Sequence, residues 1–328
     1  MSRRALVIAV AVAVLMAPVA AGAQAGKIPR IGFLASSSHS GIDGHRPLVP
    51  WLQALGYVEG RNIAFESRHA AGGDDRLPRL AAELVRSEVS LIVTTGTPAI
   101  RAAKEATSTI PIVMLASGDP VSAGLITSLS RPGGNITGVT VLAPELSGKR
   151  LELLKEIVPR LTRVAVLWNP ADPDKRLEWS ETQAAARRLG LQLVSLEARK
   201  PADLATAFQA ARNQRAGALV VLDDRLTSAY YQDIADLARK RRLPTMYPRR
   251  QFVDYLGGRG LMSYGPSTLD LSRRLAGYID RILKGARPGD LPVEQPQEFE
   301  LAINLATADA LGLKIPEAIR VRANVVVR

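Results

Sequence analysis

Two short polar segments of the chain could bind a small polar or anionic molecule. The segment TTGTP at 94–98 and the segment SGDP at 117–120 each follow a run of apolar residues. In the first segment the Thr97 hydroxyl can cap a helix, and Pro98 suits the first helical turn, where a missing N–H costs little. Free amides at the start of such a helix favour an anion such as a carboxylate. The alternative is that Ser, Thr and Gly here only cap helices and form turns.

The elements that would position these segments alternate between strand and helix along most of the chain. Apolar, β-branched runs typical of buried strands alternate with stretches of helical period. Short connections between them predict parallel, doubly wound sheets, in which the carboxyl ends of neighbouring strands meet at one edge. Strands are predicted at 31–34, 62–67, 91–93, 110–116, 136–141, 163–168, 191–196, 218–222, 244–247 and 260–263. Helices are predicted at 47–55, 74–86, 98–107, 122–129, 147–158, 178–189, 202–213, 230–241, 250–255 and 269–284. The Pro-rich tail is expected to hold a last strand and a last helix.

Residues 1–25 have the layout of a secretory signal peptide. A basic tip with Arg3 and Arg4 precedes an uncharged apolar run, and the segment ends in small residues of the A-x-A type. A transmembrane anchor is the alternative, but the run is rich in Ala, contains Pro18 and lacks a basic flank. The arginine pair leaves the general and the twin-arginine export routes both open. We therefore expect a protein released into the periplasm.

Composition excludes several classes of function. The absence of cysteine excludes disulfides, thiolate metal sites, a cysteine nucleophile and a lipid-modified cysteine after the signal peptide. The formal charge of +12 falls to +10 without Arg3 and Arg4, but no basic run is interleaved with aromatic residues, so we expect no nucleic-acid partner. The three histidines lack the spacing of a metal site. The exported protein should be soluble and not a lipoprotein.

No catalytic motif is complete. The segment GLMSYG at 260–265 has one residue too many before Ser263 for a nucleophile elbow, and no histidine follows it. A phosphate-binding P-loop is also missing. Asp223 and Asp224 follow a predicted strand and could bind a metal or act as acid and base. The alternative is that one carboxylate holds a polar group of a ligand or caps the next helix. We expect a binding protein without a cofactor rather than an enzyme.

Six segments spread over nearly the whole mature chain match the pattern of one protein family. They are PGGNITGVT, KRLELLKEIVP, RVAVLWNP, LMSYG, RILKGARPGDLPVEQP and FELAINLATADALGLKIPEAI. The block from PVEQP to ALGLKIP is the most diagnostic of one family. In these segments the chain resembles the ABC transporter substrate-binding protein family related to the tryptophan-binding TrpX type.

The resemblance implies an α/β fold of the type I periplasmic binding protein, with two Rossmann-like lobes, parallel sheets and three crossovers between the lobes. Lobe one would comprise residues 26–142 and 266–289, and lobe two residues 143–265 and 290–328. The crossovers would lie near Leu142, Gly265 and Gly289. The two glycines would suit a chain that bends at those points.

The same resemblance implies capture and release of a ligand rather than chemistry. Such a protein would be the solute-binding protein of an ABC importer, closing its lobes around a small ligand and delivering it to a permease in the inner membrane. We expect a monomer. The alternative is a binding protein that presents its ligand to a membrane receptor. A repressor of the same fold would need a DNA-binding unit where this chain carries its export signal.

The ligand would lie in the cleft between the lobes, against residues that follow strands. The residues alone do not identify the ligand. The resemblance implies an aromatic or other hydrophobic amino acid, and an aromatic acid without the amine would need only one change in the polar set. The carboxylate would meet the amides of Gly96 and Thr97, the ammonium Asp223 or Asp119, and the apolar body a tyrosine. An amine needs the Asp223 carboxylate, so an Asp223 that points away would favour the amine-free acid. Trp168 lies within its strand and is expected in the core. The candidate ligand-binding residues are Ser36, Ser37, Thr95, Gly96, Thr97, Ser117 and Asp119 in lobe one and Asn169, Asp223, Tyr247 and Tyr264 in lobe two.

Overall fold

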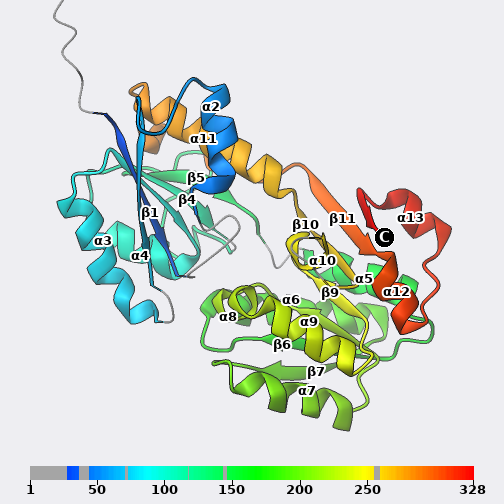
Figure 1. The fold of residues 1–328 in the computed structure, drawn as a ribbon. Helices are drawn as coiled ribbons and strands as arrows, with labels where there is room; N and C mark the ends of the chain where they lie inside the picture. The colour runs from blue at the N-terminus through cyan, green and yellow to red at the C-terminus, as the bar shows by residue number, and fades with distance from the viewer. Residues whose placement is uncertain (1–27, 37–43, 71–72, 117, 143–145, 255–258) are drawn as a thin grey trace, which may run out of the picture.

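The chain forms two lobes, each built around its own β-sheet (Figure 1). The computed structural model describes residues 28–36, 44–70, 73–116, 118–142, 146–254 and 259–328. The predicted signal peptide at 1–25 and the candidate residues Ser37 and Ser117 lie outside these described residues. Within them, no helix has the length and apolar character that a membrane span requires.

Lobe one is a five-stranded sheet covered by helices on both faces. Its strands are β1 (Arg30–Ala35), β2 (Ala64–His69), β3 (Leu91–Thr95), β4 (Ile112–Ala116) and β5 (Ile136–Thr140). Its helices are α2 (Val49–Ala54), α3 (Leu77–Arg86), α4 (Thr97–Ala106) and α11 (Thr268–Leu283), with short 3-10 turns before α2 and α3. The strands run parallel in the order β2-β1-β3-β4-β5. Because neighbouring side chains point to opposite faces, Ile92 packs with α3 and α4, and Leu91 and Val93 pack with α2 and α11.

Lobe two is a seven-stranded sheet, also covered on both faces. Its strands are β6 (Arg163–Trp168), β7 (Gln192–Glu197), β8 (Ala218–Val221), β9 (Thr245–Tyr247), β10 (Met262–Pro266), β11 (Phe299–Asn304) and β12 (Val325–Val327), in the order β12-β11-β10-β9-β8-β6-β7. One face packs against α5 (Ser147–Ile157), α6 (Pro173–Leu189), α12 (Leu305–Leu311) and α13 (Glu317–Arg322). The other face packs against α7 (Asp203–Asn213), α8 (Arg225–Ala229), α9 (Tyr231–Lys240) and α10 (Gln251–Asp254).

The predicted pair of doubly wound lobes is confirmed, with one correction to the second sheet. Strand β11 runs antiparallel to β10, with Tyr264 opposite Leu301, so this sheet is not wholly parallel. The chain enters β11 directly after its last crossover, without the helix that a parallel connection needs. The tail also holds two helices and the strand β12 beyond β11, where one strand and one helix were predicted.

Two predicted helices differ from those in the structure. The stretch 122–129 forms turns, because Gly124 takes a positive φ of 68° and the Thr127 hydroxyl bonds the Arg131 carbonyl. The helix predicted at 178–189 begins earlier, at Pro173, because the Asp172 carboxylate caps it by accepting from the Asp174 amide. The added first turns of α6 bring several charged residues to the space between the lobes.

Three crossovers join the lobes, and the third lies later than predicted. The first follows β5, where Leu142 has a positive φ of 47°, and the second is the step from β10 to α11. Figure 1 shows α11 lying beside β5 in lobe one and the chain after it returning to β11 in lobe two. Val293 is buried in the core of lobe one, and the Glu294 amide bonds the Gly138 carbonyl at 3.0 Å. The last crossover therefore follows Glu294, and the predicted boundary at Gly289 is too early.

Candidate ligand-binding site

A cavity of about 280 Å³ lies between the two lobes. Lobe one contributes the carboxyl ends of β1, β3 and β4 and the first turn of α4. Lobe two contributes the carboxyl ends of β6 and β8 and the first turns of α6 and α8. This is the edge at which open α/β sheets bind ligands. The volume is close to the lower limit for a small-molecule site, so the cleft suits a ligand of amino-acid size.

Six of the predicted site residues meet in this cleft. They are Ser36, Thr95, Gly96, Thr97, Asn169 and Asp223. In the register of the sheet Ala35 pairs with Thr95, so Ser36 lies next to the loop that opens α4. The Ser36 hydroxyl is buried and has no hydrogen-bond partner among the described residues. It is therefore available to a ligand.

Three other predicted residues do not line the cleft. Tyr247 is fully buried in the core of lobe two, where its ring stacks on Phe252 at 5.1 Å and where burial raises its pKa. Tyr264 stacks on Phe299 and packs against the core. Asp119 accepts hydrogen bonds from the Ser122 hydroxyl and the Val121 amide, which together lower its pKa. Their assignment to the cleft is wrong because a residue near a strand end can equally face the core or cap a turn.

Trp168 lies in the core, as predicted. Its indole stacks on Trp179 at 5.3 Å, and its Nε1 donates to the Ser195 hydroxyl at 2.8 Å. The last residue of β6 thus buries its ring beneath α6 rather than offering it to a ligand.

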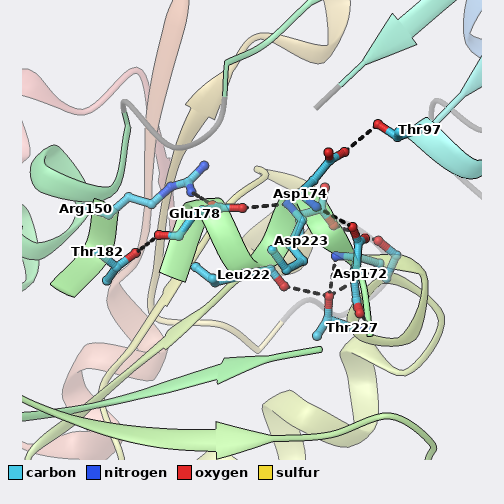
Figure 2. Close-up of polar contacts among 12 residues, drawn as sticks. Thr97, Arg150, Asp172, Asp174, Glu178, Thr182, Leu222, Asp223 and Thr227 are labelled. Atoms are coloured by element: carbon cyan, nitrogen blue, oxygen red, sulfur yellow. Dashed lines mark hydrogen bonds and ion pairs between the residues drawn. The ribbon is translucent and has the colours of Figure 1, made fainter. Parts of the chain in front are cut away.

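Thr97 has a different role from the predicted helix cap. Gly96 occupies the N-cap position with φ of 80°, a conformation that suits glycine, and α4 begins at Thr97. The Thr97 hydroxyl donates to Oδ2 of Asp174 at 2.5 Å, so it reaches from lobe one to lobe two (Figure 2). A second contact between the lobes joins Nε of Arg225 to Oδ1 of Asp74 at 3.5 Å. The lobes therefore touch at the mouth of the cleft.

Lobe two lines the cleft with a group of aspartates. Burial raises the pKa of Asp172 to about 6, since the positive charge of Lys175 offsets only part of that effect and Asp174 adds to it. Asp224 caps α8 in a capping box with Thr227, and burial raises its pKa as well. Of the alternatives open for the Asp223–Asp224 pair, the capping role is confirmed for Asp224.

Asp223 points into the cleft, but its charge is already paired. Nε of Arg249 lies 3.0 Å from Oδ2 of Asp223, and the Ser228 hydroxyl donates to Oδ1 at 2.7 Å. A ligand ammonium would therefore compete with a guanidinium at this carboxylate. The described residues contain no group of three or more side chains able to hold a metal ion.

A buried ionic group that the sequence did not reveal lies on the same wall. Glu178 accepts from Nη1 of Arg150 at 2.9 Å and from Nζ of Lys175 at 2.6 Å (Figure 2). All three side chains are at most 2% exposed. Arg150 lies on the helix predicted at 147–158, and Lys175 lies between the predicted strand at 163–168 and the predicted helix at 178–189. No local signal distinguished either from a surface residue.

Comparison with known proteins identifies the family. Residues 31–327 match the family model described as ABC transporter substrate binding protein. The chain is similar to a tyrosine-binding protein of Clostridioides difficile (strain R20291), at 26% identity over 88% of this chain and 82% of the relative.

Two solved structures have the same fold. A conserved domain protein from Vibrio cholerae is 30% identical, with a TM-score of 0.84 over 92% of this chain and 100% of the other. An ABC domain in complex with L-Trp from Streptococcus pneumonia is 24% identical, with a TM-score of 0.83 and the same coverage of both chains. The fold is that of the type I periplasmic binding proteins. The chain belongs to the ABC transporter substrate binding protein family.

Proposed function

We propose that this protein is the periplasmic solute-binding protein of an ABC importer and that it captures an amino acid with an aromatic or hydrophobic side chain by lobe closure. The observation that carries the proposal is the cleft itself, which is lined by both lobes and combines acidic, apolar and free donor groups. Relatives that bind tyrosine and L-Trp support the same class of ligand.

Lobe one offers the carboxylate site. The first turn of α4 opens into the cleft, and no side chain caps it. Its free amides and the helix dipole favour an anion, and the unpartnered Ser36 hydroxyl adds a donor beside them. The carboxylate of an amino acid would bind there.

Lobe two offers the ammonium site. Asp172 and Asp174 line the cleft from the first turn of α6, opposite Thr97. Arg249 offsets the charge of Asp223, which leaves these two aspartates as the stronger partners for a cation. An aromatic acid without an amine would bring no positive charge to these two carboxylates, so the wall favours an amino acid.

The apolar body of the ligand would lie toward the crossovers. Apolar side chains line the cleft there from the ends of β4, β5 and β10 and from the start of α11. They are Leu115, Ala116, Val141, Pro266 and Leu271. Closure would bring these side chains and the two polar sites around one molecule, and the closed form would be the one that the permease binds.

The ligand class is tested by thermal unfolding of the mature chain with amino acids and aromatic acids. A ligand at about 100 times its Kd should stabilise the protein by about 2.7 kcal/mol. The α-carboxamide and the amine-free acid of the best ligand should both bind more weakly. If no amino acid raises the unfolding midpoint, the proposed ligand class is wrong.

The importer role is tested by uptake. Cells that lack the gene should lose uptake of the labelled ligand at low concentration, and the wild-type gene should restore it. Binding without any effect on uptake would favour presentation to a membrane receptor instead.

A further inference from the structure

Arg150 carries a free hydrogen-bond donor at the inner end of the cleft. Its side chain is 2% exposed and lines the cavity. Nε donates to the Tyr264 carbonyl and Nη1 to Glu178, both at 2.9 Å. Nη2 makes no hydrogen bond to any described residue. Nη2 is not among the fully buried polar atoms that lack a partner, so it keeps access to the cavity that Arg150 lines. A charged donor at that position favours an acceptor from a ligand.

The surroundings of Arg150 hold it rigid and charged. Its partner Glu178 is shared with Lys175, so two buried cations face one carboxylate. Burial acts to lower the pKa of Lys175, but the charges of Glu178 and Asp172 outweigh it and raise that pKa. Both oxygens of Glu178 are therefore occupied. A guanidinium can only donate, so the ligand group that meets Nη2 must be an acceptor.

Arg150 lies at the opposite end of the cleft from the contact between Thr97 and Asp174. Asp174 and Glu178 are four residues apart on one face of α6, which places them about 6 Å apart along the helix axis. Figure 2 shows Thr97 and Asp174 toward one end of this helix segment and Arg150 with Glu178 toward the other. A Cβ on Gly265, beside Pro266, would lie 3.9 Å from Nη2 of Arg150. The arginine thus faces the apolar end of the cleft.

We propose that Arg150 is a specificity-determining residue that donates from Nη2 to an acceptor at the far end of the ligand side chain. The site would then select an amino acid with a phenol tip over the same amino acid with a plain phenyl tip. Glu178 acts as a positioning residue that fixes the guanidinium. This inference rests on the proposed function, because it requires the α-amino acid group to bind between α4 and α6.

A site discriminates strongly between a phenol tip and a phenyl tip when one of its buried groups forms a hydrogen bond with the phenol oxygen. A phenyl tip would displace water from Nη2 and leave a buried charged donor without a partner, whereas a phenol oxygen replaces that water. A hydrogen bond to a charged group predicts that L-tyrosine binds at least about tenfold more tightly than L-phenylalanine.

The test is calorimetric titration of the mature chain with L-tyrosine, L-phenylalanine and tyramine, repeated for Arg150→Met. In this variant Lys175 still neutralises Glu178, so no buried carboxylate is left unpaired. The variant should lose the preference for tyrosine, with phenylalanine affinity changing less than about threefold. Tyramine keeps the phenol but lacks the carboxylate. Its affinity for the variant should fall by the same factor as that of tyrosine. Lys149→Met is the matched control, because Lys149 is on the same helix and exposed, and it should keep the wild-type preference.

Three results would overturn the inference. Equal affinity of the wild-type protein for tyrosine and phenylalanine would do so, and this comparison holds even if the variant fails to fold. An equal loss of affinity for tyrosine and phenylalanine in Arg150→Met, with the affinity for tyramine unchanged, would mean that Arg150 binds the α-carboxylate. Wild-type preference retained in the variant would exclude Arg150 from specificity. In all three cases amino acids still bind, whereas failure of every amino acid to bind would overturn the proposed function as well.

Discussion

The Thr97 hydroxyl and the Asp174 carboxylate meet across the cleft at 2.5 Å, joining the first turn of α4 to the first turn of α6. The two helices belong to different lobes, so this hydrogen bond can exist only while the lobes are together. Gly118 also lies against the same carboxylate, since a Cβ there would be 2.8 Å from its carbon atom. The Asp174 carboxylate therefore stabilises the observed contact between the lobes, in addition to its favourable place in the first turn of α6.

Thr97→Val should shift the protein toward an open form. The variant removes a part-buried hydrogen bond to a carboxylate. Such a bond contributes about 1.5–3 kcal/mol when fully buried and less when one partner is partly exposed to solvent. We expect ligand affinity to fall by about threefold to tenfold. Small-angle scattering should show a larger radius of gyration without ligand, and calorimetry gives the affinity.

Asp174→Asn is a second test of this contact, and Thr206→Val is the control. Asp174→Asn weakens the same bond from the other side and should raise the radius of gyration in the same way. Its loss of affinity should be larger than that of Thr97→Val, because it also removes a charge proposed to face the ligand ammonium. Thr206 is exposed on α7, away from the cleft, so Thr206→Val should behave as the wild type. If Thr97→Val leaves both the radius of gyration and the affinity unchanged, the contact does not stabilise closure.

Binding of an amino acid should strengthen as the pH rises from 5 to 7. Because burial raises the pKa of Asp172 to about 6, this carboxyl is mostly protonated at pH 5 and mostly ionised at pH 7. Only the ionised form can pair with an ammonium group. The affinity should rise by up to about tenfold over this interval and level off above it. Titration in two buffers of different ionisation enthalpy should show proton release near pH 6.

Asp172→Asn provides the control for this pH dependence. An asparagine can still cap α6 but carries no charge, so the variant should bind more weakly at pH 7 and show a flatter profile. A wild-type affinity that falls between pH 5 and 7 would exclude Asp172 as a partner of the ammonium group.

The fold could be predicted from the sequence because strand and helix patterns are local. The order of strand, turn and helix around 91–106 was predicted correctly, since an apolar β-branched run followed by Thr, Gly and Pro has few other interpretations. The bounds differ, because the strand extends through Thr95, and because Gly96 rather than Thr97 is the residue before the helix. The direction of β11 could not be predicted in this way, because it depends on which edge of lobe two the chain reaches after its last crossover.

The candidate site could be predicted only in part. Loop positions after strands indicated Ser36, Thr97 and Asp223, because all carboxyl ends of a parallel sheet share one edge. Whether the last side chain of a strand faces the cleft or the core depends on pleat and packing, which is why Tyr247 was misplaced. Arg150 was missed because its partners, Glu178 and the Tyr264 carbonyl, are distant in sequence.

Glu178→Gln should destabilise the folded protein strongly. The substitution leaves Arg150 buried without its carboxylate partner and leaves Lys175 with only the charges of Asp172 and Asp223. Breaking a buried ion pair typically costs about 3–5 kcal/mol. Urea unfolding monitored by circular dichroism would measure the loss.

Glu152→Gln is a matched control for that substitution. Glu152 also pairs with a lysine three residues before it, but both side chains are more than 40% exposed. Its loss should cost at most about 0.5 kcal/mol. Equal costs for the two variants would mean that the charges of the buried group are solvated in the folded protein.

Gly265→Ala should destabilise the junction between the lobes, although Gly265 is not the free hinge that the sequence suggested. It lies within β10 opposite Glu300, and a Cβ there would be 1.9 Å from the Pro248 carbonyl oxygen. Because the obstacle is backbone, the strand itself must move, at a cost of at least about 1–3 kcal/mol. Gly277 lies in α11 with no atom within 4 Å of such a Cβ, so Gly277→Ala should stabilise by about 0.5–1 kcal/mol. Urea unfolding should show a lower midpoint for Gly265→Ala and a higher one for Gly277→Ala. A wild-type midpoint for Gly265→Ala would mean that the backbone of β10 can move at this point, as that of a hinge can.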